Sequence, residues 1–294
     1  MTNLEKVLQQ NNLAAILNDN SSKSKKQKML DDCTPIILRQ LGADDLIKHN
    51  RMVYDMTVKE YAQTSHNQDI IDELLLFMNM LPDRAHVLDI GCGTGRDALF
   101  MAIKARSFRQ SLMGRTRDGM ATHERFCVPQ KAFVVTGIDF SREMQLVARD
   151  KAVQFIEMGL LMSGDVVFFQ EDMHHKNFAN PSRYDGIWSC TALFTHTPRS
   201  LLDTAMEGVC YRLKPGGLFF TSYTNGCVDE QYDKLLLSST GYVKYFSQPD
   251  PDEITKLAKK YDMTLKAQMF SDFEVDGKIL KPNLFVSQFF RKAS

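Results

Sequence analysis

A run of glycines at every second position is the first stretch of this sequence that could do chemistry. In VLDIGCGTGRD, residues 87–97, Asp89 stands two residues before Gly91, and Gly93 and Gly95 follow. Glycine costs backbone entropy but lets a ligand approach the main chain, and the amides that open the next helix favour a negative group. We therefore expect a ligand to lie against this turn. Dinucleotide dehydrogenases usually show GxGxxG, a different spacing.

The elements that must position this turn alternate between strands and helices. Five short apolar segments are predicted strands: residues 86–90, 133–139, 165–170, 184–190 and 217–223. Helical patterns lie between them, which predicts βαβ units around a parallel sheet. Two further strands are predicted near 264–270 and 284–290. No crossover helix fits between these two, so we expect them to pair antiparallel.

The first 80 residues are predicted to form a helical extension in front of this unit. Apolar residues recur at helical spacing over 2–17, about 35–48 and about 67–80, and the polar segment 18–28 is interpreted as a linker. The chain is thus expected to divide into a helical extension or lid, 1–80, and an α/β domain, 81–294. A lid, a dimer arm and a partner-binding element are the roles open to the extension.

Composition is that of an ordinary globular protein. The 36 Lys and Arg residues balance 36 Asp and Glu residues, so no global field points to nucleic acid or to a membrane. The N-terminus lacks the apolar core of a signal peptide, and no apolar run is long enough to span a bilayer. The six cysteines form no CxxC pair, which favours free thiols in a reducing compartment. We therefore expect a cytoplasmic protein with no membrane partner.

Acidic residues lie at or just after the ends of the first three predicted strands. Their order along the chain resembles that in class I S-adenosylmethionine-dependent methyltransferases. The acid-x-G-x-G-x-G pattern at Asp89 is similar to the first motif of that family. Asp139 matches the acid that binds the ribose hydroxyls, and two acceptor oxygens on one carboxylate suit a cis-diol. Asp172 matches the residue that contacts the adenine amino group. YDGIWSC (184–190) and LKPGG (213–217) resemble later motifs.

The resemblance implies a fold, a cofactor and a subgroup. Over about residues 85–294 it implies a Rossmann-like, doubly wound seven-stranded α/β sheet in the order 3-2-1-4-5-7-6, last strand antiparallel, that binds S-adenosyl-L-methionine. GCGTGRDALFMA, IWSCTALFTHTP, LKPGGLFFTSY and YDMTVKEYA are also similar to small bacterial methyltransferases of the GCGxGRD, tellurite-resistance-like type. In such enzymes the last of these segments, residues 54–62, covers the cofactor.

The resemblance also selects candidate cofactor-binding residues. They are Tyr54, Tyr61, Asp89, Gly91, Cys92, Gly93, Gly95, Arg96, Asp139, Phe140, Ser141, Met144, Asp172, Met173, Ser189 and Cys190. Arg96 suits a methionyl carboxylate through a charge-assisted fork, and the alternative is an ion pair with an acid of the protein. Tyr54 and Tyr61 share a helix face and either contact the cofactor or anchor the N-terminal segment. Met144 either flanks the adenine or packs within its helix.

His196 is the candidate catalytic residue, six positions after Cys190 at the end of the fourth predicted strand. Ligands bind beyond the carboxyl ends of parallel strands, so His196 could serve as a general base. The alternative is a helix-cap histidine that packs against the acceptor pocket. A covalent role for Cys190 is not expected, because no paired base is near it in sequence. His174 and His175 are expected to be surface loop residues, and no metal site is expected.

One segment departs from the family pattern. The interval from Gly95 to Asp139 is about twice the ~20 residues usual between these two positions. Residues 105–131 are therefore predicted to be an insertion, and most of its charges are basic. Recognition of phosphate, nucleic acid or an acidic partner is one reading of that charge, and a solvated loop is the other.

These observations predict a methyltransferase that transfers a methyl group to an O, N or S atom of a small-molecule acceptor. The acceptor pocket is expected to form from the N-terminal segment, the loop after Cys190 and residues 224–248. One alternative is an RNA or protein methyltransferase that docks through the basic insertion. Another is a non-catalytic S-adenosylmethionine-binding interaction protein, and a dehydrogenase is the least favoured.

Overall fold

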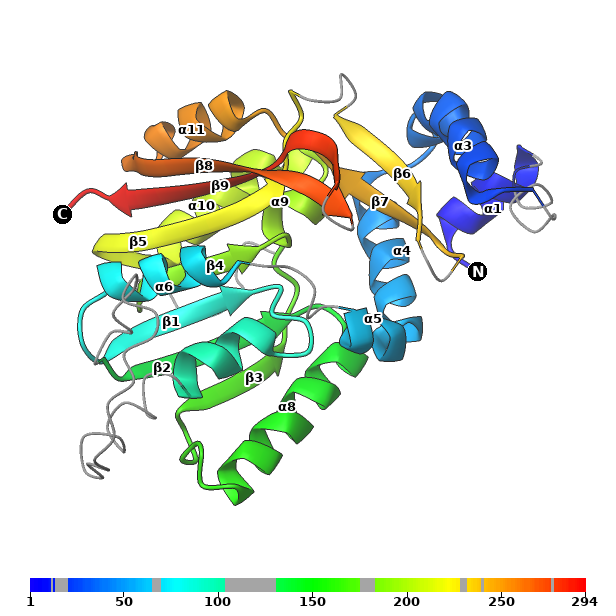
Figure 1. Ribbon diagram of the computed structural model, residues 1–294. Coiled ribbons are helices and arrows are strands. Elements are labelled where there is room, and N and C mark those ends of the chain that lie inside the picture. Colours follow the sequence, from blue (N-terminus) through cyan, green and yellow to red (C-terminus); the bar gives the residue numbers. More distant parts are fainter. Residues whose placement is uncertain are drawn as a thin grey trace.

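A seven-stranded sheet runs through the centre of the computed structural model (Figure 1). The structure describes residues 1–11, 13, 21–64, 70–103, 131–174, 183–227, 232–238, 241–275 and 278–294. The sheet order is β3-β2-β1-β4-β5-β9-β8. These strands are β1 (Ala85–Ile90), β2 (Phe133–Asp139), β3 (Val166–Gln170), β4 (Tyr184–Cys190), β5 (Leu213–Thr224), β8 (Met263–Val275) and β9 (Lys278–Lys292). The order 3-2-1-4-5-7-6 expected from the sequence is confirmed.

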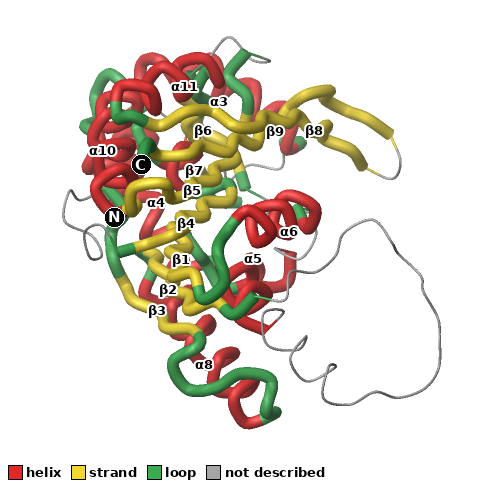
Figure 2. The backbone as a smooth tube through the Cα atoms, turned by 90° about the vertical axis from the view of Figure 1, so that its left-hand side faces the viewer, coloured by secondary structure: helices red, strands yellow, loops and turns green. Residues whose placement is uncertain are grey.

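Strand direction follows from the connections. The pairs β1–β2, β2–β3, β1–β4 and β4–β5 are parallel, and β9 is antiparallel to both β5 and β8. A hairpin joins β8 to β9 and projects beyond the rest of the sheet (Figure 2). Because the chain order turns around at β1, whose neighbours are β2 and β4, a crevice is expected beyond the carboxyl ends of these strands.

Helices cover both faces of the sheet (Figures 1 and 2). One face carries α6 (Ile71–Met80), the helical residues 96–103 and α8 (Arg142–Glu157), whereas the other carries α10 (Leu202–Arg212) and α11 (Pro251–Lys260). The short α9 (Leu193–His196) follows β4 directly. Among the described residues, no helix combines the length and apolar character that crossing a membrane requires.

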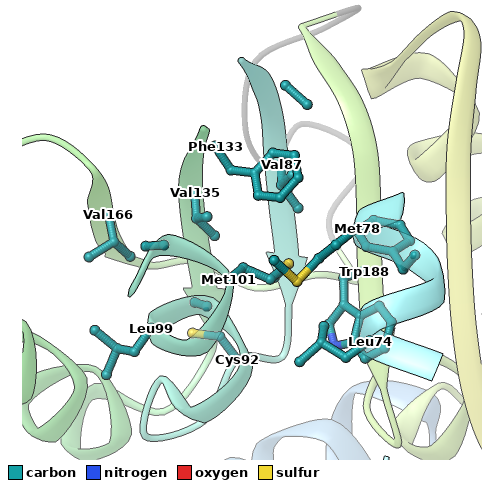
Figure 3. Packing of buried hydrophobic residues seen from close by; sticks show 14 of the residues in the cluster. Leu74, Met78, Val87, Cys92, Leu99, Met101, Phe133, Val135, Val166 and Trp188 are labelled. Carbon is teal, nitrogen blue, oxygen red and sulfur yellow. The ribbon is translucent and has the colours of Figure 1, made fainter. Parts of the chain in front are cut away.

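A buried tryptophan ties β4 to the helices on the first face (Figure 3). The Trp188 ring stacks on Phe220 with their centroids 3.8 Å apart, and Phe77 of α6 packs against it at 5.1 Å. Leu74 and Met78, also from α6, lie beside it. Each such buried side chain stabilises the fold by about 1.5–3 kcal/mol. This packing holds the end of β4 beside the turn that follows β1.

Three N-terminal helices share an apolar cluster with a small second sheet. The helices are α1 (Asn3–Gln10), α3 (Lys23–Leu38) and α4 (Ala43–Met56), and the sheet is the antiparallel pair β6 (Asp233–Leu237) and β7 (Val243–Ser247). Helix α5 (Val58–Thr64) follows α4 and brings Tyr61 to the turn after β1. Leu30 and Leu46 bury against Leu235 and Tyr245. Figure 1 shows the blue N-terminal helices beside this yellow hairpin. Segments about 200 positions apart therefore share one apolar cluster.

Two predictions about the N-terminal region are wrong in detail. Residues 23–28 belong to α3 and not to a linker, because the Ser22 hydroxyl accepts a hydrogen bond from the Lys25 amide and begins the helix there. The helix predicted over about 35–48 is two helices, since Gly42 begins α4. The predicted insertion at 105–131 lies outside the described residues except for Lys131.

Candidate functional site

A cavity opens beyond the carboxyl ends of β1, β2 and β4, where the crevice was expected. It encloses about 470 Å³, open solvent at its mouth included, and is lined by Tyr54, Tyr61, Gly91, Gly93, Ile138, Asp139, Phe140, Met144, Glu171, Met173, Cys190, Thr191, Ala192 and His196. An adjoining cavity of about 340 Å³ is lined by Tyr61, Asp89, Gly91, Cys92, Thr94, Arg96, Asp97, Cys190 and Thr191. Most residues predicted to bind a cofactor therefore meet in one place.

The glycine turn after β1 has the backbone shape that only glycine adopts readily. Gly91, Gly93 and Gly95 have φ angles of +69°, +53° and +81°. The sequence led us to expect main-chain amides available to a ligand, but the amides of this turn are already hydrogen-bonded. Gly91 and Cys92 donate to the Ile138 carbonyl at 2.8 and 3.0 Å, and Gly93 donates to Asp139. The turn thus offers a ligand space rather than free amides, because its N–H groups stabilise the turn itself.

The three glycines differ in what occupies the space beside them. A Cβ on Gly91 would lie 2.3 Å from Cβ of Ala192, and one on Gly95 would lie 2.9 Å from the Phe168 ring. A Cβ on Gly93 would lie 3.2 Å from the Tyr61 ring. Gly95 lies outside both cavities and is explained by internal packing, whereas Gly91 and Gly93 line them.

Asp139 is a buried carboxylate at the end of β2, 8% exposed. Its Oδ2 accepts the Gly93 amide at 2.9 Å and its Oδ1 accepts the Ser141 amide at 2.8 Å. Burial raises the pKa of Asp139 to about 6. Each oxygen keeps a free lone pair for a ligand hydroxyl. The residue is therefore both fixed in position and able to accept further hydrogen bonds.

Asp89 is a second buried acid and has an unsatisfied oxygen. Its Oδ2 has no hydrogen-bond partner, and the residue lines the adjoining cavity. Burial, with Asp97 nearby, raises the pKa of Asp89 well above its usual value. A buried oxygen without a partner costs about 1–3 kcal/mol, more when charged, so a donor placed in this cavity would be stabilised.

Arg96 pairs with its neighbour in the described structure. Its Nε and Nη2 donate to the two oxygens of Asp97 at 2.7 and 3.1 Å, and Trp188 Nε1 donates to Asp97 Oδ2 at 2.9 Å. Arg96 also approaches Cys190 Sγ at 3.6 Å and lines the adjoining cavity. Thus the ion-pair alternative is present, and the guanidinium still borders the space where a carboxylate was predicted to bind.

Ser141 and Ser189, both predicted to bind the cofactor, make hydrogen bonds that hold elements together. The Ser141 hydroxyl accepts from the Met144 amide at 3.2 Å, which begins α8, and donates to Asp55 at 2.6 Å. The Ser189 hydroxyl donates to the Ile90 carbonyl and accepts from the Leu193 amide. Neither residue lines a described cavity.

Asp172 and His174 form a pair just after β3. One oxygen of Asp172 accepts both the backbone amide of His174, at 2.9 Å, and its ring Nδ1, at 2.8 Å. The His174 side chain is only 4% exposed, so the expectation of a surface residue is wrong for it. Its Nε2 is buried without a partner. Asp172 lies outside both cavities, while its neighbours Glu171 and Met173 line the larger one.

Tyr54, His196 and Asn50 form a chain of hydrogen bonds at the other wall. Asn50 Oδ1 accepts the Tyr245 amide at 2.9 Å and its Nδ2 donates to the Tyr245 carbonyl at 2.8 Å, which fixes the orientation of the amide group. Nδ2 also faces His196 Nδ1 at 3.4 Å, and His196 Nε2 lies 3.0 Å from the Tyr54 hydroxyl. Burial lowers the pKa of His196 to about 3, so its ring is neutral. A neutral imidazole has one donor and one acceptor nitrogen, so His196 is the acceptor in only one of its contacts with Asn50 and Tyr54.

Two side chains of β7 contact residues of this wall, and both belong to the segment 224–248 that was expected to help form the acceptor pocket. Phe246 lies 5.2 Å from the His196 ring, and the Lys244 ammonium lies 3.9 Å from the centroid of the Tyr54 ring. Tyr245, by contrast, faces the apolar cluster of the N-terminal helices. No motif signals these contacts, since the partners lie more than 40 positions apart. Strand periodicity over 243–247 would have shown which side chains share a face.

Comparison with known proteins identifies a methyltransferase domain in this chain. A family model described as "Methyltransferase domain" matches residues 59–268. The 1,6-didemethyltoxoflavin-N1-methyltransferase of Burkholderia thailandensis, solved with its acceptor and S-adenosylhomocysteine, superposes with a TM-score of 0.57 at 14% identity, over 86% of this chain and 92% of that one. A methyltransferase from Methanosarcina mazei gives 0.54 at 17% identity, over 74% and 97%.

A third solved structure bears on the predicted subgroup. A TehB-like S-adenosylmethionine-dependent methyltransferase from Corynebacterium glutamicum superposes with a TM-score of 0.51 at 15% identity, over 81% of this chain and 98% of that one. At such identities these likenesses show the fold alone. No curated protein matches the chain in sequence.

Proposed function

This chain belongs to the methyltransferase-domain family, and from that premise we propose that it methylates a small-molecule acceptor at an O, N or S atom. The observation that carries the proposal is the meeting of Asp139, the glycine turn and His196 in one cavity. A cavity of about 470 Å³ suits a cofactor with a small acceptor beside it. Kinship with the tellurite-resistance-like group stays a prediction, supported by the quoted motifs.

S-adenosylmethionine is the cofactor, as predicted, and the residues present fit it. When bound, it supplies an electrophilic methyl group on a sulfonium. Asp139 would accept the two ribose hydroxyls, and Phe140 and Met144 would flank the adenine. The unsatisfied Oδ2 of Asp89 would accept from the amino group of the methionyl part. Gly91 and Gly93 line the cavity in which this placement lies.

The remaining work of the chain is to align the acceptor and exclude water. Tyr54 and Tyr61, edge to face with centroids 5.9 Å apart, line the cavity on the side of α4 and α5. Burial raises the pKa of Tyr54 well above its usual value, so its hydroxyl stays protonated.

A general base is needed only if the atom that receives the methyl group carries a proton. Two histidines are candidates for that base. His196 stays the prediction, although both of its nitrogens are engaged and its pKa is low. His174 differs: its Nδ1 lies 2.8 Å from Oδ1 of Asp172, and its buried Nε2 has no hydrogen-bond partner. Transfer to a thiolate or a neutral amine needs neither.

The test combines binding with transfer. Calorimetry of the full chain with S-adenosylhomocysteine is expected to show one site, and incubation with methyl-labelled S-adenosylmethionine and a metabolite extract is expected to yield a labelled small molecule. Tight binding without any labelled product would support the non-catalytic alternative instead. Label found only in added RNA or protein would overturn the small-molecule assignment.

A further inference from the structure

A buried lysine of the β6–β7 hairpin packs against Tyr54, one of the residues that line the cavity. Lys244 in β7 is 9% exposed, and its Nζ lies over the Tyr54 ring, 3.9 Å from the centroid. Among the residues that the structure describes, no carboxylate forms an ion pair or hydrogen bond with this ammonium. Burial, the sole cause of the shift, lowers the pKa of Lys244 to about 8.

This placement is costly unless something completes it. Taking an ammonium out of water is unfavourable when no partner compensates for the lost hydration. The contact with the Tyr54 ring offsets only part of that cost. A bound anion would compensate for the lost hydration of the Lys244 ammonium.

Hydrogen bonds to the neighbouring helix fix the backbone on both sides of Lys244, and they thereby set the direction of its side chain. His49 Nε2 donates to the Val243 carbonyl at 2.7 Å, and Asn50 binds both backbone groups of Tyr245. Since side chains alternate along a strand, Val243 and Tyr245 point into the N-terminal cluster. Lys244 and Phe246 therefore point to the opposite side, toward Tyr54 and His196.

The two sides of the cavity differ in the charges that lie near them. The side near β1 and β2 carries Asp139 and Glu171, with Asp89 in the adjoining cavity. On the other side Tyr54 and the neutral His196 line the cavity, and the Lys244 ammonium lies against the Tyr54 ring without itself lining the cavity. Donors and a cation recognise an anionic oxygen, and a flexible lysine stem can carry the ammonium past the ring edge.

We propose that the methyl acceptor is a monoanion whose anionic oxygen group, a carboxylate in the simplest case, is bound by Lys244 with Tyr54. The proposal rests on the methyltransferase function and names its substrate class. One lysine supplies one positive charge, and the acids at the other end disfavour a dianion such as a phosphate monoester. The Tyr54 ring, which lines the cavity, favours a planar body for the acceptor.

The experiment measures the charge preference of the acceptor end directly. The full chain is saturated with S-adenosylhomocysteine, and dissociation constants are measured by ligand-observed NMR for benzoate against benzamide and for phenylacetate against phenylacetamide. Each carboxylate is expected to bind at least ten-fold more tightly than its amide. Lys244→Met is expected to bring that ratio close to one, and Lys244→Arg to retain it. Lys256→Met, which removes an exposed lysine from α11, is the matched control and should change nothing.

The outcomes separate this proposal from the function it rests on. Unchanged S-adenosylhomocysteine affinity in Lys244→Met shows that the variant is folded, and a lost affinity would assign the lysine to the cofactor instead. A ratio near one in the unmodified chain, a ratio that survives in Lys244→Met, or no carboxylate binding at all would each overturn the proposal. If S-adenosylhomocysteine itself fails to bind, the proposed function fails first. The carboxylate preference should also fade as pH rises through about 8, where the lysine loses its proton.

Discussion

The two walls of the cavity are built in different ways. The wall at β1 and β2 comes from turns that directly follow strands, and its geometry is set by local backbone shape, as the positive φ angles of Gly91 and Gly93 show. The opposite wall joins α4 to β7 through contacts such as Asn50 with Tyr245, 195 positions apart. The first wall carries carboxylates and the second a cation. A binding function common to a family can thus be encoded locally, whereas the features that distinguish one member depend on tertiary packing.

Blocking the glycine wall is expected to have the largest effect. A valine in place of Gly93 meets the Tyr61 ring and is strained at φ +53°, so Gly93→Val should weaken S-adenosylhomocysteine binding by at least about 3 kcal/mol in calorimetry. Gly159→Val is the control, because Gly159 has a similar φ of +73° with nothing within 4 Å of its Cβ. Equal affinity of the two variants would contradict the close approach at Gly93.

Removing the buried acid of the same wall should have the next largest effect. Asp139→Ala is expected to weaken S-adenosylhomocysteine binding by about 1.5–3 kcal/mol, as for hydrogen bonds to a charged group. Because burial raises the pKa of Asp139 to about 6 and the ribose hydroxyls need the ionised form, affinity should fall as pH drops below about 6. Asp139→Asn should remove that pH dependence. A pH profile that is the same in both forms would refute the ribose assignment.

Cutting the tie between α4 and β7 should change stability more than cofactor binding. Asn50→Ala leaves the buried amide and carbonyl of Tyr245 unpaired, so the free energy of unfolding should fall by about 1–3 kcal/mol in denaturant titration. Asn3→Ala, which removes an exposed hydrogen bond to Asp45 of α4, should cost less than about 0.5 kcal/mol. If Asn50→Ala instead abolished S-adenosylhomocysteine binding at unchanged stability, the division between the two walls would be wrong.

The smallest effect is expected at His196. As a support for the Tyr54 hydroxyl it contributes one hydrogen bond, so His196→Ala should lower turnover by about ten-fold with little change in cofactor affinity. A loss of about 100-fold or more would show that it also acts as the general base that the sequence predicts. His174→Ala, measured in parallel, shows whether the Asp172-paired ring performs that step instead.

The same difference explains what the sequence could predict. Asp139 and the glycine turn were found because strand ends and turn residues leave local marks, and the strand order followed from alternating patterns. The expectation that the amides of the glycine turn are available to a ligand was wrong. The Ile138 carbonyl and the Asp139 carboxylate, both from the neighbouring strand, accept their hydrogen bonds. Lys244 was missed because its burial depends on helices that precede it by about 190 positions. Long-range packing of this kind has no local periodicity.

A crystal structure of the full chain with S-adenosylhomocysteine tests the central claim most directly. The account predicts the ribose hydroxyls within hydrogen-bond distance of the Asp139 carboxylate, beside Gly91 and Gly93, with the sulfur facing the side of Tyr54 and His196. A nucleoside bound anywhere else, or an Asp139 that contacts only Gly93 and Ser141 while the ligand is present, would contradict it.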